Sequence, residues 1–576
     1  MKTSDYIVDF FIQKGITDVF GYPGGMVTHL MDSLGKRGDE IHTHITYHEQ
    51  AAAFAACGFA QASGKCGVAF ATSGPGATNL ITGIGNAYYD SIPTVFITGQ
   101  VNTFESKGDR GIRQRGFQET DIVTAVKGMT KAAIYISKAE DVPGVLEEAY
   151  GIAMTARRGP VLLDIPMDVL RAEIDADKDY VICNGNKTAP SRPDETERFA
   201  KCLNDALSSA DRPCIVVGNG IKIDHQVNNI RGILRSCPIP VVSSMIAVDV
   251  VPEGHGLEGL YYGFIGAYGN RTANFVVAKS DLVICLGTRL DVRQVGGKRE
   301  NFAPDARIIR IDIDKAELDN KIRDDEMSFE MSLDDAIPVL RKVLAKGGYT
   351  YNKWIDVCQT IKKQIKYTDE KEPNRFINRI SRAVPDGCGI VVDVGQHMVW
   401  TAQSFRMKPD QRIYFSGGMG SMGYALPAAI GVYYATHRPV VCFAGDGGLQ
   451  MNIQELQFLA REQIPVKIIV LNNRALGMIR HFQEMYFERK YFYTVRNEGY
   501  LAPDFVKIAS AYGIKASKLY EMEDMEAIDF EEDIPELFEI VIKGDTYVFP
   551  KLEFGKPNQD QEPLLDRSLY DYLMEL

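Results

Sequence analysis

Pro439-Val-Val-Cys-Phe-Ala-Gly-Asp446 and Val466-Lys-Ile-Ile-Val-Leu-Asn472 are the two stretches that decide the predicted fold. Each is a β-branched apolar run that ends on a Gly-Asp or Asn turn next to a helical pattern, which is typical of parallel α/β layers. The same pattern occurs upstream, for example in Gly67-Val-Ala-Phe-Ala-Thr-Ser-Gly74 and Arg307-Ile-Ile-Arg-Ile-Asp-Ile-Asp314. We therefore expect an α/β fold of three doubly wound, parallel-sheet domains in series.

The spacing of these patterns divides the chain. We expect domains at residues 1–175, 198–345 and 375–548, joined by polar linkers at about 184–197 and 347–374. Residues 549–576 form a tail that contains proline and acidic residues, and no pattern places it. At roughly 100 to 200 residues per domain, the 576 residues suffice for about three domains.

Composition excludes several classes of protein. The chain carries 64 Lys and Arg against 76 Asp and Glu, a net charge of -12, which argues against nucleic acid as a partner. No segment approaches the roughly 18 unbroken apolar residues of a membrane span, and residues 1–15 read as an amphipathic helix without a cleavage site. The ten cysteines form no Cys-x-x-Cys pair. We expect a cytoplasmic protein without membrane association.

Gly445-Asp-Gly447 and the later pair Asn472-Asn473 form the strongest local signal. An Asp at one strand end and an Asn at the next can supply oxygen ligands to one octahedral cation, while the glycines let the backbone approach a phosphate. For Gly-Asp-Gly alone, an ordinary turn is the better interpretation. The Asn pair shifts the interpretation to a site for a diphosphate and a metal ion.

Three further motifs lie in the first domain. Glu49 opens a helix rich in small residues, whose close packing could shield the carboxylate and raise its pKa. The alternative is an acidic residue that merely stabilises the first turn of a helix. Thr72-Ser-Gly-Pro-Gly-Ala-Thr-Asn79 and Gly21-Tyr-Pro-Gly-Gly25 follow strands and could present backbone groups to a ligand, although such turns are also common structural elements.

Taken together and in this order, the motifs resemble the thiamine-diphosphate-dependent enzymes of the acetolactate synthase type. The resemblance covers nearly the whole chain. Besides the motifs above, it rests on Gly116-Phe-Gln-Glu119, Gly159-Pro-Val-Leu-Leu-Asp-Ile-Pro166 and Gly417-Gly-Met-Gly-Ser-Met-Gly-Tyr-Ala-Leu-Pro-Ala-Ala-Ile-Gly431.

The resemblance implies a pyrimidine-binding first domain, a central nucleotide-binding-like domain and a diphosphate-binding third domain. Mg²⁺ would be held by Asp446, Asn473 and the backbone carbonyl of Ala475. Glu49 would act on the aminopyrimidine ring from the first domain of a partner subunit, which implies a homodimer or homotetramer. The residues implied at thiamine diphosphate are Pro23, Gly24, Thr72, Pro75, Asn79, Gln396, His397, Gly420, Met422, Gly445, Asp446, Gly447, Gly448, Asn473, Gly477 and Met478.

The resemblance also implies substrate contacts and a second cofactor. Phe117, Gln118 and Lys131 would lie beside the substrate, although Lys131 alone reads equally well as a solvated surface lysine. The central domain resembles one that binds FAD without a redox role, through residues that include Gly218, Arg289 and Asp312. The alternative is a related domain that has lost its nucleotide or holds another one.

The implied activity is carboligation. The enzyme would decarboxylate a 2-keto acid, pyruvate, and transfer the two-carbon unit to a second carbonyl, as in acetolactate synthesis. Phe482 stands where the family usually has a Trp that helps to select the acceptor. The ending at 549–565 looks more like that of acetolactate synthase-like proteins associated with surface-polysaccharide sugars. The alternative is therefore transfer from pyruvate to a keto-sugar nucleotide. No two of the nine histidines are adjacent, which disfavours a simple decarboxylase. No sequence motif indicates whether a regulatory subunit binds.

Overall fold

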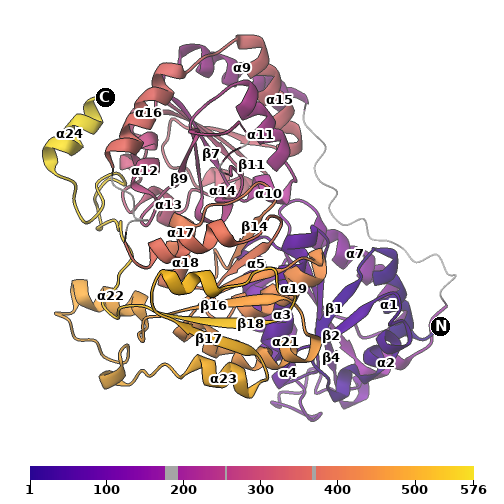
Figure 1. The fold of residues 1–576 in the computed structure, drawn as a ribbon. Coiled ribbons are helices and arrows are strands. Elements are labelled where there is room, and N and C mark those ends of the chain that lie inside the picture. The colour runs from indigo at the N-terminus through magenta and orange to yellow at the C-terminus, as the bar shows by residue number, and fades with distance from the viewer. Residues whose placement is uncertain (176–192, 253, 255, 366–370) are drawn as a thin grey trace.

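Three six-stranded sheets, all with parallel strands and flanked by helices, make up the protein in this computed structural model (Figure 1). The structure describes residues 1–175, 193–252, 254, 256–365 and 371–576, so most of the predicted linker at 184–197 lies outside the described residues. The three sheets confirm the predicted fold class. No helix in the described ranges has the length and apolar character needed to cross a membrane.

The first sheet has the strand order β2-β1-β3-β4-β6-β5. Its strands are β1 (Asp18–Gly21), β2 (His42–Ile45), β3 (Gly67–Ala71), β4 (Thr94–Gln100), β5 (Ala132–Tyr135) and β6 (Pro160–Pro166). Its helices are α1 (Thr3–Gln13), α2 (Thr28–Lys36), α3 (Glu49–Ser63), α4 (Pro75–Asn79), α5 (Ile81–Tyr89), α6 (Ile122–Val126), α7 (Val142–Met154) and α8 (Met167–Arg171).

The second sheet has the order β12-β11-β10-β7-β8-β9. Its strands are β7 (Pro213–Val217), β8 (Val241–Ser243), β9 (Tyr261–Phe264), β10 (Leu282–Leu286), β11 (Arg307–Asp312) and β12 (Met327–Glu330). Its helices are α9 (Pro193–Ser209), α10 (Gly220–Ile223), α11 (Val227–Ser236), α12 (Arg271–Lys279), α13 (Val292–Val295), α14 (Lys315–Asp319), α15 (Leu333–Gly347) and α16 (Asn352–Gln364).

The third sheet has the order β14-β13-β15-β16-β18-β17, which repeats the order of the first. Its strands are β13 (Gly389–Val392), β14 (Arg412–Phe415), β15 (Val440–Gly445), β16 (Val466–Asn472), β17 (Lys515–Leu519) and β18 (Glu536–Val541). Its helices are α17 (Asn374–Ala383), α18 (Gln396–Ser404), α19 (Ala425–Thr436), α20 (Asp446–Leu449), α21 (Leu456–Glu462), α22 (Gly477–Tyr486) and α23 (Phe505–Ala511).

Strand order locates the places where ligands bind such sheets. In open α/β sheets, ligands bind beyond the carboxyl ends of the strands where the order reverses. That point lies between β1 and β3 in the first sheet, between β7 and β10 in the second, and between β13 and β15 in the third. The second sheet has the strand order of dinucleotide-binding folds. Each domain therefore offers one switch point to a ligand.

Helices α3 and α19 join the first domain to the third. A Cβ at Gly58 would collide with the backbone of Ala428, and one at Gly431 would collide with the backbone of Ala55. Small residues at these positions let the two helices approach closely. The contact belongs to one hydrophobic core that draws side chains from both domains.

Glu455 is a buried carboxylate at the same junction. Its side chain is fully buried, and both its oxygens accept hydrogen bonds from the Tyr47 N–H, at 2.9 and 3.2 Å. Burial raises the pKa of Glu455 to about 8, and the hydrogen bond from Tyr47 partly opposes this shift.

We expect Glu455→Gln to remove a pH dependence of folding stability. The folded state binds this proton more tightly than the unfolded chain, so the stabilisation is fully present below pH 4.5 and is lost as the pH rises through about 8. Relative to the variant, the parent protein should show a falling unfolding temperature from pH 5 to pH 9, measured by scanning calorimetry. An unfolding-temperature difference that is constant over this range would contradict the expectation.

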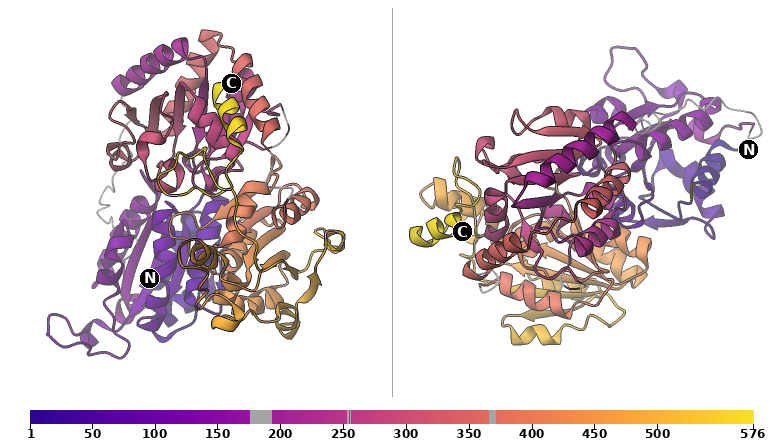
Figure 2. Two further views of the ribbon diagram at one scale, coloured as in Figure 1. Left: turned by 90° about the vertical axis from the view of Figure 1, so that its left-hand side faces the viewer. Right: turned by 90° about the horizontal axis from the view of Figure 1, so that it is seen from above.

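The chain end, which no sequence pattern placed, packs against the central domain. The segment after β18 runs alongside the third and central domains and ends in α24 (Arg567–Glu575) (Figures 1 and 2). The buried Leu573 of α24 packs with Phe275 of α12 and Ile361 of α16. Lys279 donates a hydrogen bond to the carbonyl of Met574 at 2.6 Å. The tail therefore links the third domain to the central one.

The second predicted linker contains a helix. All of α16 falls within the stretch at 347–374 that was expected to be a linker, and its buried Trp354 and Cys358 belong to the central core. Trp354 also donates a hydrogen bond from its indole N–H to the carbonyl of Pro213 at 3.0 Å. The helix therefore extends the central domain beyond the expected boundary at residue 345.

Candidate functional site

Polar side chains gather at the switch point of the third sheet. Gln396 and His397 open α18 after β13, Asp446 opens α20 after β15, and Asn473 directly follows β16. Because the carboxyl ends of these parallel strands meet at one edge, the four side chains lie at the same place. We call these four residues the third-domain cluster.

Two buried nitrogens of this cluster have no hydrogen-bond partner among the residues that the structure describes. The amide of Asn473 donates to Oε1 of Gln396 at 2.8 Å, which orients the Gln396 side chain. Nε2 of Gln396 and Nε2 of His397 are buried, and neither has a hydrogen-bond partner among the described residues. Burial lowers the pKa of His397 to about 3, so its ring is neutral at pH 7. Buried groups of this kind are normally hydrogen-bonded, so their orphaned nitrogens fit an anionic ligand.

Glycines keep this cluster open. A Cβ at Gly445 would lie 2.8 Å from Nδ1 of His397, and one at Gly477 would collide with the side chain of Gln396. A Cβ at Gly447 would lie 2.8 Å from the Leu476 side chain and 3.1 Å from the terminal methyl of Met422. The glycines therefore form a narrow cradle beside an apolar wall, which suits a phosphate approached by the backbone.

The other predicted residues of the third domain lie in segments that follow strands of the same sheet. The N–H of Ala475 donates to the side-chain oxygen of Asn473 at 3.2 Å. A Cβ at Gly448 would lie 3.0 Å from the carboxyl group of Asp393. Gly420 has a φ of +68°, and Met478 packs at the edge of the third-domain core.

Tyr500 is a member of the site that no sequence pattern indicated. Its hydroxyl donates to Oδ2 of Asp446 at 2.9 Å, and Nε2 of Gln450 lies 3.4 Å from the same hydroxyl. Burial raises the pKa of Asp446 to about 7, and the hydrogen bond from Tyr500 opposes this shift. Tyr500 therefore fixes the orientation of a carboxylate that could ligate a cation.

We expect Tyr500→Phe to weaken cation binding by about tenfold, because groups that orient a metal-binding carboxylate typically contribute 10- to 100-fold. The measurement is the Mg²⁺ concentration that gives half-maximal binding of the cation, determined by calorimetric titration. Tyr520→Phe, at an exposed position after β17 of the third domain, is the control and should leave this concentration unchanged. Equal Mg²⁺ requirements for Tyr500→Phe and the parent would contradict the assignment.

A second cluster lies at the switch point of the first sheet. The amide of Asn79 donates to Oε2 of Glu49 at 2.9 Å, and only 9% of Glu49 is exposed. A Cβ at Gly76 would lie 3.2 Å from Oε1 of Glu49, and one at Gly24 would collide with Thr72. We call Glu49, Thr72 and Asn79 the first-domain cluster. It presents one carboxylate between close-packed turns.

Gln118 lies next to this cluster. Its backbone has a φ of +66°, and a Cβ at Gly74 would lie 3.0 Å from the Gln118 Cβ. Phe117 projects into solvent with 80% of its surface exposed. Pro75 begins α4, beside the same turn, and Pro23 lies in the exposed turn after β1. The structure thus brings most first-domain candidates to one edge of the sheet.

Lys131 lies away from this edge of the first sheet. It precedes β5, so it sits at the amino edge of the parallel sheet, whereas Gln118 contacts the carboxyl edge at Gly74. Its ammonium donates to the carbonyls of Ile152 and, at 2.8 Å, Thr155. Burial lowers the pKa of Lys131 to about 8. The structure does not bring Lys131 to the predicted substrate site, and its contacts are those of a lysine that caps the end of α7.

The central switch point holds a small cavity of about 160 Å³. Its walls include Arg289 and Asp312, and a Cβ at Gly218 would collide with the turn at Gly287, so the two turns touch. Oγ of Ser244 faces this region as a buried atom without a partner among the described residues. The polar groups fit part of a nucleotide, but the cavity is below the roughly 300 Å³ of sites that enclose a whole ligand.

Comparison with known proteins identifies the class. Residues 1–125 match the N-terminal TPP binding domain of thiamine pyrophosphate enzymes, residues 200–340 match their central domain, and residues 393–545 match their C-terminal TPP binding domain. The chain belongs to the thiamine pyrophosphate enzymes. The two TPP binding domains are those that carry the first-domain and third-domain clusters.

Within that family the chain is similar to acetolactate synthase large subunits. It is 35% identical to the isozyme 2 large subunit of Escherichia coli, over 97% of this chain and 99% of that protein. It is 35% identical to the large subunit of Lactococcus lactis, over 96% and 94% of the two chains. A probable large subunit of Methanocaldococcus jannaschii is 36% identical, over 94% and 92%.

Proposed function

We propose that this protein is a thiamine-diphosphate-dependent carboligase that decarboxylates pyruvate and joins the two-carbon unit to a second 2-keto acid, forming acetolactate. The observation that carries the proposal is the third-domain cluster. There, two buried side-chain nitrogens that have no partner in the part of the chain the structure describes face a glycine cradle and a buried carboxylate. The similarity to acetolactate synthase large subunits favours this reaction over transfer to a keto-sugar nucleotide.

The third-domain cluster would hold the diphosphate and Mg²⁺. Nε2 of Gln396 and the neutral ring of His397 would donate to phosphate oxygens, which would give both orphaned groups a partner. Oxygens of Asp446, Asn473 and the Ala475 backbone are the hard ligands that Mg²⁺ prefers. The side chains of Met422 and Leu476 lie against Gly447 and supply an apolar wall to the cradle.

When bound, thiamine diphosphate supplies the electron sink that makes decarboxylation and carbon–carbon bond formation possible. The protein's part is to bind, orient and move protons. Glu49 would exchange a proton with the ring nitrogen of the aminopyrimidine, and the amide of Asn79 would hold that carboxylate in place. Phe117 and Gln118 would border the substrate.

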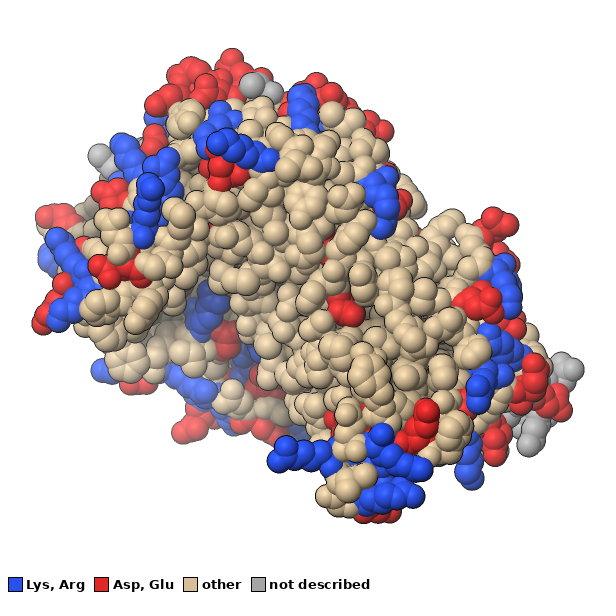
Figure 3. Space-filling model, turned by 90° about the horizontal axis from the view of Figure 1, so that it is seen from below, with Lys and Arg blue, Asp and Glu red and all other residues tan. Residues whose placement is uncertain are grey.

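We propose that a complete site needs two chains. The hydrogen bond to the Glu49 carboxylate comes from Asn79 of the first domain, whereas Asp446 is bound by Tyr500 of the third. Figure 3 shows a broad area of the underside with few charged side chains, with Lys, Arg, Asp and Glu around its edges. Exposed Tyr88, Tyr89 and Met419 add apolar surface to these domains. Such a surface supports a homodimer.

We propose FAD, without a redox role, as the ligand of the central switch point. Three observations support it: the dinucleotide-type strand order, the touching turns at Gly218 and Gly287, and the buried hydroxyl of Ser244, which has no partner within the described ranges. Because the cavity measures about 160 Å³, FAD would have to extend beyond it. The absorbance of the purified protein near 450 nm tests this directly, and a colourless protein that takes up no added FAD would refute it.

Product analysis tests the main proposal. The purified protein is mixed with Mg²⁺, thiamine diphosphate and pyruvate, with and without a panel of keto-sugar nucleotides. Acetolactate from pyruvate alone supports the proposal. Pyruvate turnover that depends on one sugar would move the assignment to carbohydrate synthesis.

Since the relatives are named as large subunits, we also propose a smaller partner subunit, which co-expression and co-purification would detect.

A further inference from the structure

Two carboxylates from different domains hold the segment that connects β14 to α19. This segment, residues 416–423, carries Met422 into the wall of the diphosphate cradle, and we call it the Met422 loop. Asp393 of the third domain accepts the N–H of Gly423 at 2.9 and 3.1 Å, at the end of the loop. Asp90, which follows α5 in the first domain, holds its beginning. The loop is therefore anchored on two domains of one chain.

Asp90 binds the loop through both of its carboxylate oxygens. Oδ2 accepts the N–H of Gly417 at 2.8 Å, and Oδ1 accepts the N–H of Gly418 at 2.7 Å. Only 6% of Asp90 is exposed. Burial raises the pKa of Asp90 to about 6 and the two hydrogen bonds oppose this shift, so the group is charged at pH 7. Hydrogen bonds to a charged acceptor are roughly twice as strong as those between neutral groups. The loop is therefore firmly docked on the end of α5.

Helix α5 makes a second contact with the loop one turn earlier. The hydroxyl of Ser416 donates to Oδ1 of Asn86 at 2.6 Å and accepts the N–H of Ser421 at 2.9 Å. Asn86 and Ser416 are fully buried. Because Asn86 is four residues before Asp90, the two side chains lie on one face of α5. This face therefore fixes the beginning of the loop and, through Ser416, the residue that directly precedes Met422.

The same contact forms part of the wall of the central cavity. The residues that line this cavity of about 160 Å³ include Asp90 and Gly417, the two partners of one hydrogen bond. They also include Arg289, whose positive charge favours the ionised form of Asp90. A Cβ at Gly417 would lie 2.7 Å from the side chain of Ile246, another lining residue. A ligand of the central cavity would therefore touch both the end of α5 and the loop that is docked on it.

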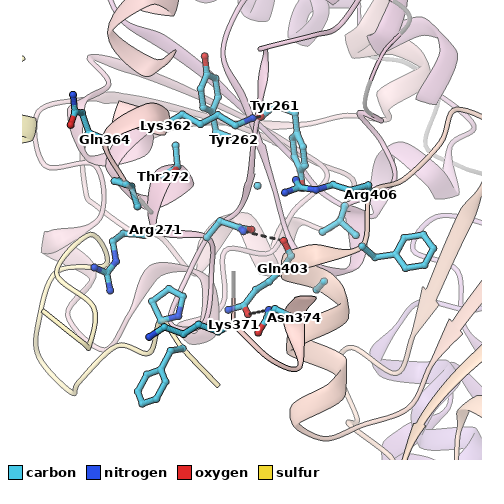
Figure 4. A pocket seen from close by; sticks show the side chains of 18 of the residues that line it. Tyr261, Tyr262, Arg271, Thr272, Lys362, Gln364, Lys371, Asn374, Gln403 and Arg406 are labelled. Carbon is cyan, nitrogen blue, oxygen red and sulfur yellow. Dashed lines mark hydrogen bonds between the residues drawn. The ribbon is translucent and has the colours of Figure 1, made fainter. Parts of the chain in front are cut away.

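A larger cavity, of about 960 Å³, is lined by other segments. It lies between β9 and α12 of the central domain, the end of α18 and the tail (Figure 4). Asn374 and Gln403, which are labelled in Figure 4, hydrogen-bond to one another at 3.1 Å in its wall. None of its described lining residues belongs to the Met422 loop. Of these two cavities, the central one is therefore the one whose occupancy acts directly on the loop.

We propose that Asp90 is a positioning residue that couples the central cavity to the thiamine diphosphate site through the Met422 loop. When the loop is docked, Gly417 completes the wall of the central cavity and Met422 lies against Gly447 of the cradle. When the loop leaves Asp90, both arrangements are lost together. Two ligands that both favour the docked loop raise one another's affinity, typically by about 5- to 150-fold. The inference rests on the proposed function for the identity of the two ligands, FAD and thiamine diphosphate.

The first test is calorimetric titration of the full-length protein with thiamine diphosphate in saturating Mg²⁺, with FAD present and after its removal. We expect the parent to bind thiamine diphosphate at least about fivefold more tightly with FAD present. Asp90→Asn turns an amide N–H₂ group toward one of the two backbone N–H groups. This variant should therefore bind thiamine diphosphate about tenfold more weakly than the FAD-loaded parent, and with an affinity that FAD does not change. Asp39→Asn, at an exposed position between α2 and β2 of the same domain, is the matched control and should keep the parental affinity and FAD effect.

Gly418→Ala tests the same contact from the side of the loop. The added methyl would lie 2.7 Å from the Cβ of Tyr89 and would push the loop away from α5, whereas Asp90 itself is unchanged. The FAD effect on thiamine diphosphate affinity should be lost in this variant as well. Hydrogen exchange at residues 416–423, measured without thiamine diphosphate, reports the docking of the loop itself. It should slow when FAD is added to the parent and stay fast in both variants.

Three results would overturn the proposal: parental affinity for thiamine diphosphate in Asp90→Asn, an FAD effect of equal size in the parent and both variants, or exchange at 416–423 that FAD leaves unchanged in the parent. Failure of the proposed function has a different signature. A parent that binds no thiamine diphosphate refutes the carboligase. A parent that binds no FAD refutes the central cofactor and the coupling together, and the thiamine diphosphate affinity of Asp90→Asn then still decides whether Asp90 positions the loop.

Discussion

Glu49→Gln is expected to lower turnover by at least about 100-fold, the usual contribution of a positioned proton-transfer group. The amide of Gln has nearly the shape of the carboxylate, so Asn79 can still donate to its oxygen and the fold should persist. What Gln cannot do is exchange a proton with the ring nitrogen of the aminopyrimidine. Affinity for Mg²⁺ and thiamine diphosphate, whose proposed phosphate and metal ligands lie in the third domain, should change little.

The measurement is steady-state acetolactate formation together with calorimetric binding of thiamine diphosphate. Glu147→Gln is the matched control, because Glu147 is a carboxylate of the same domain that pairs with Lys14 at 2.8 Å on the surface. The control should keep parental turnover. Turnover of Glu49→Gln close to that of the parent would exclude Glu49 from proton transfer.

Asp446→Asn is expected to raise the Mg²⁺ requirement for thiamine diphosphate binding by on the order of 100-fold, because a charged ligand of the cation is replaced by a neutral one. The amide oxygen can still accept the hydrogen bond from Tyr500, so the loop that carries Tyr500 should stay in place. Glu49 is unchanged in this variant, so activity should return in part at high Mg²⁺ and cofactor concentrations.

Rescue by Mg²⁺ separates the roles of the two carboxylates. Titration of both variants with Mg²⁺ should restore turnover in Asp446→Asn and leave Glu49→Gln inactive. Asp410→Asn, at an exposed position before β14, is the control for the loss of one carboxylate in the third domain. An Mg²⁺ requirement of Asp446→Asn equal to that of the parent would refute the metal site.

The sequence predicted those parts of the site that follow a strand directly. Asp446 and Asn473 are each adjacent to an apolar run, and parallel strands must bring such neighbours to one edge. Tyr500 escaped prediction because it is 54 residues beyond its partner Asp446, in a segment without periodicity. Its contact depends on how that segment folds back over the third domain.

The incorrect predictions, for Lys131 and for the second linker, also have physical causes. Lys131 lies before a strand and not after it, so the parallel direction of the sheet carries it to the edge opposite Gln118. In the stretch expected to be a linker, Trp354, Cys358 and Ile361 recur at intervals of four and three, which is a helical pattern. The polar composition of the stretch led to the prediction of a linker instead.

The strand order of the central sheet was not predictable from the sequence, because strand order depends on packing between distant segments.

The contact between α3 and α19 also constrains how the molecule can move. Gly58 and Gly431 let the two helix backbones pack in direct contact. Separating the first and third domains of one chain would therefore expose their shared hydrophobic core, so no simple hinge motion can part them. These two domains should therefore travel as one rigid piece. Entry and exit of substrates then falls to segments that contribute no side chain to this shared core, namely the exposed segment around Phe117, α22 and the tail.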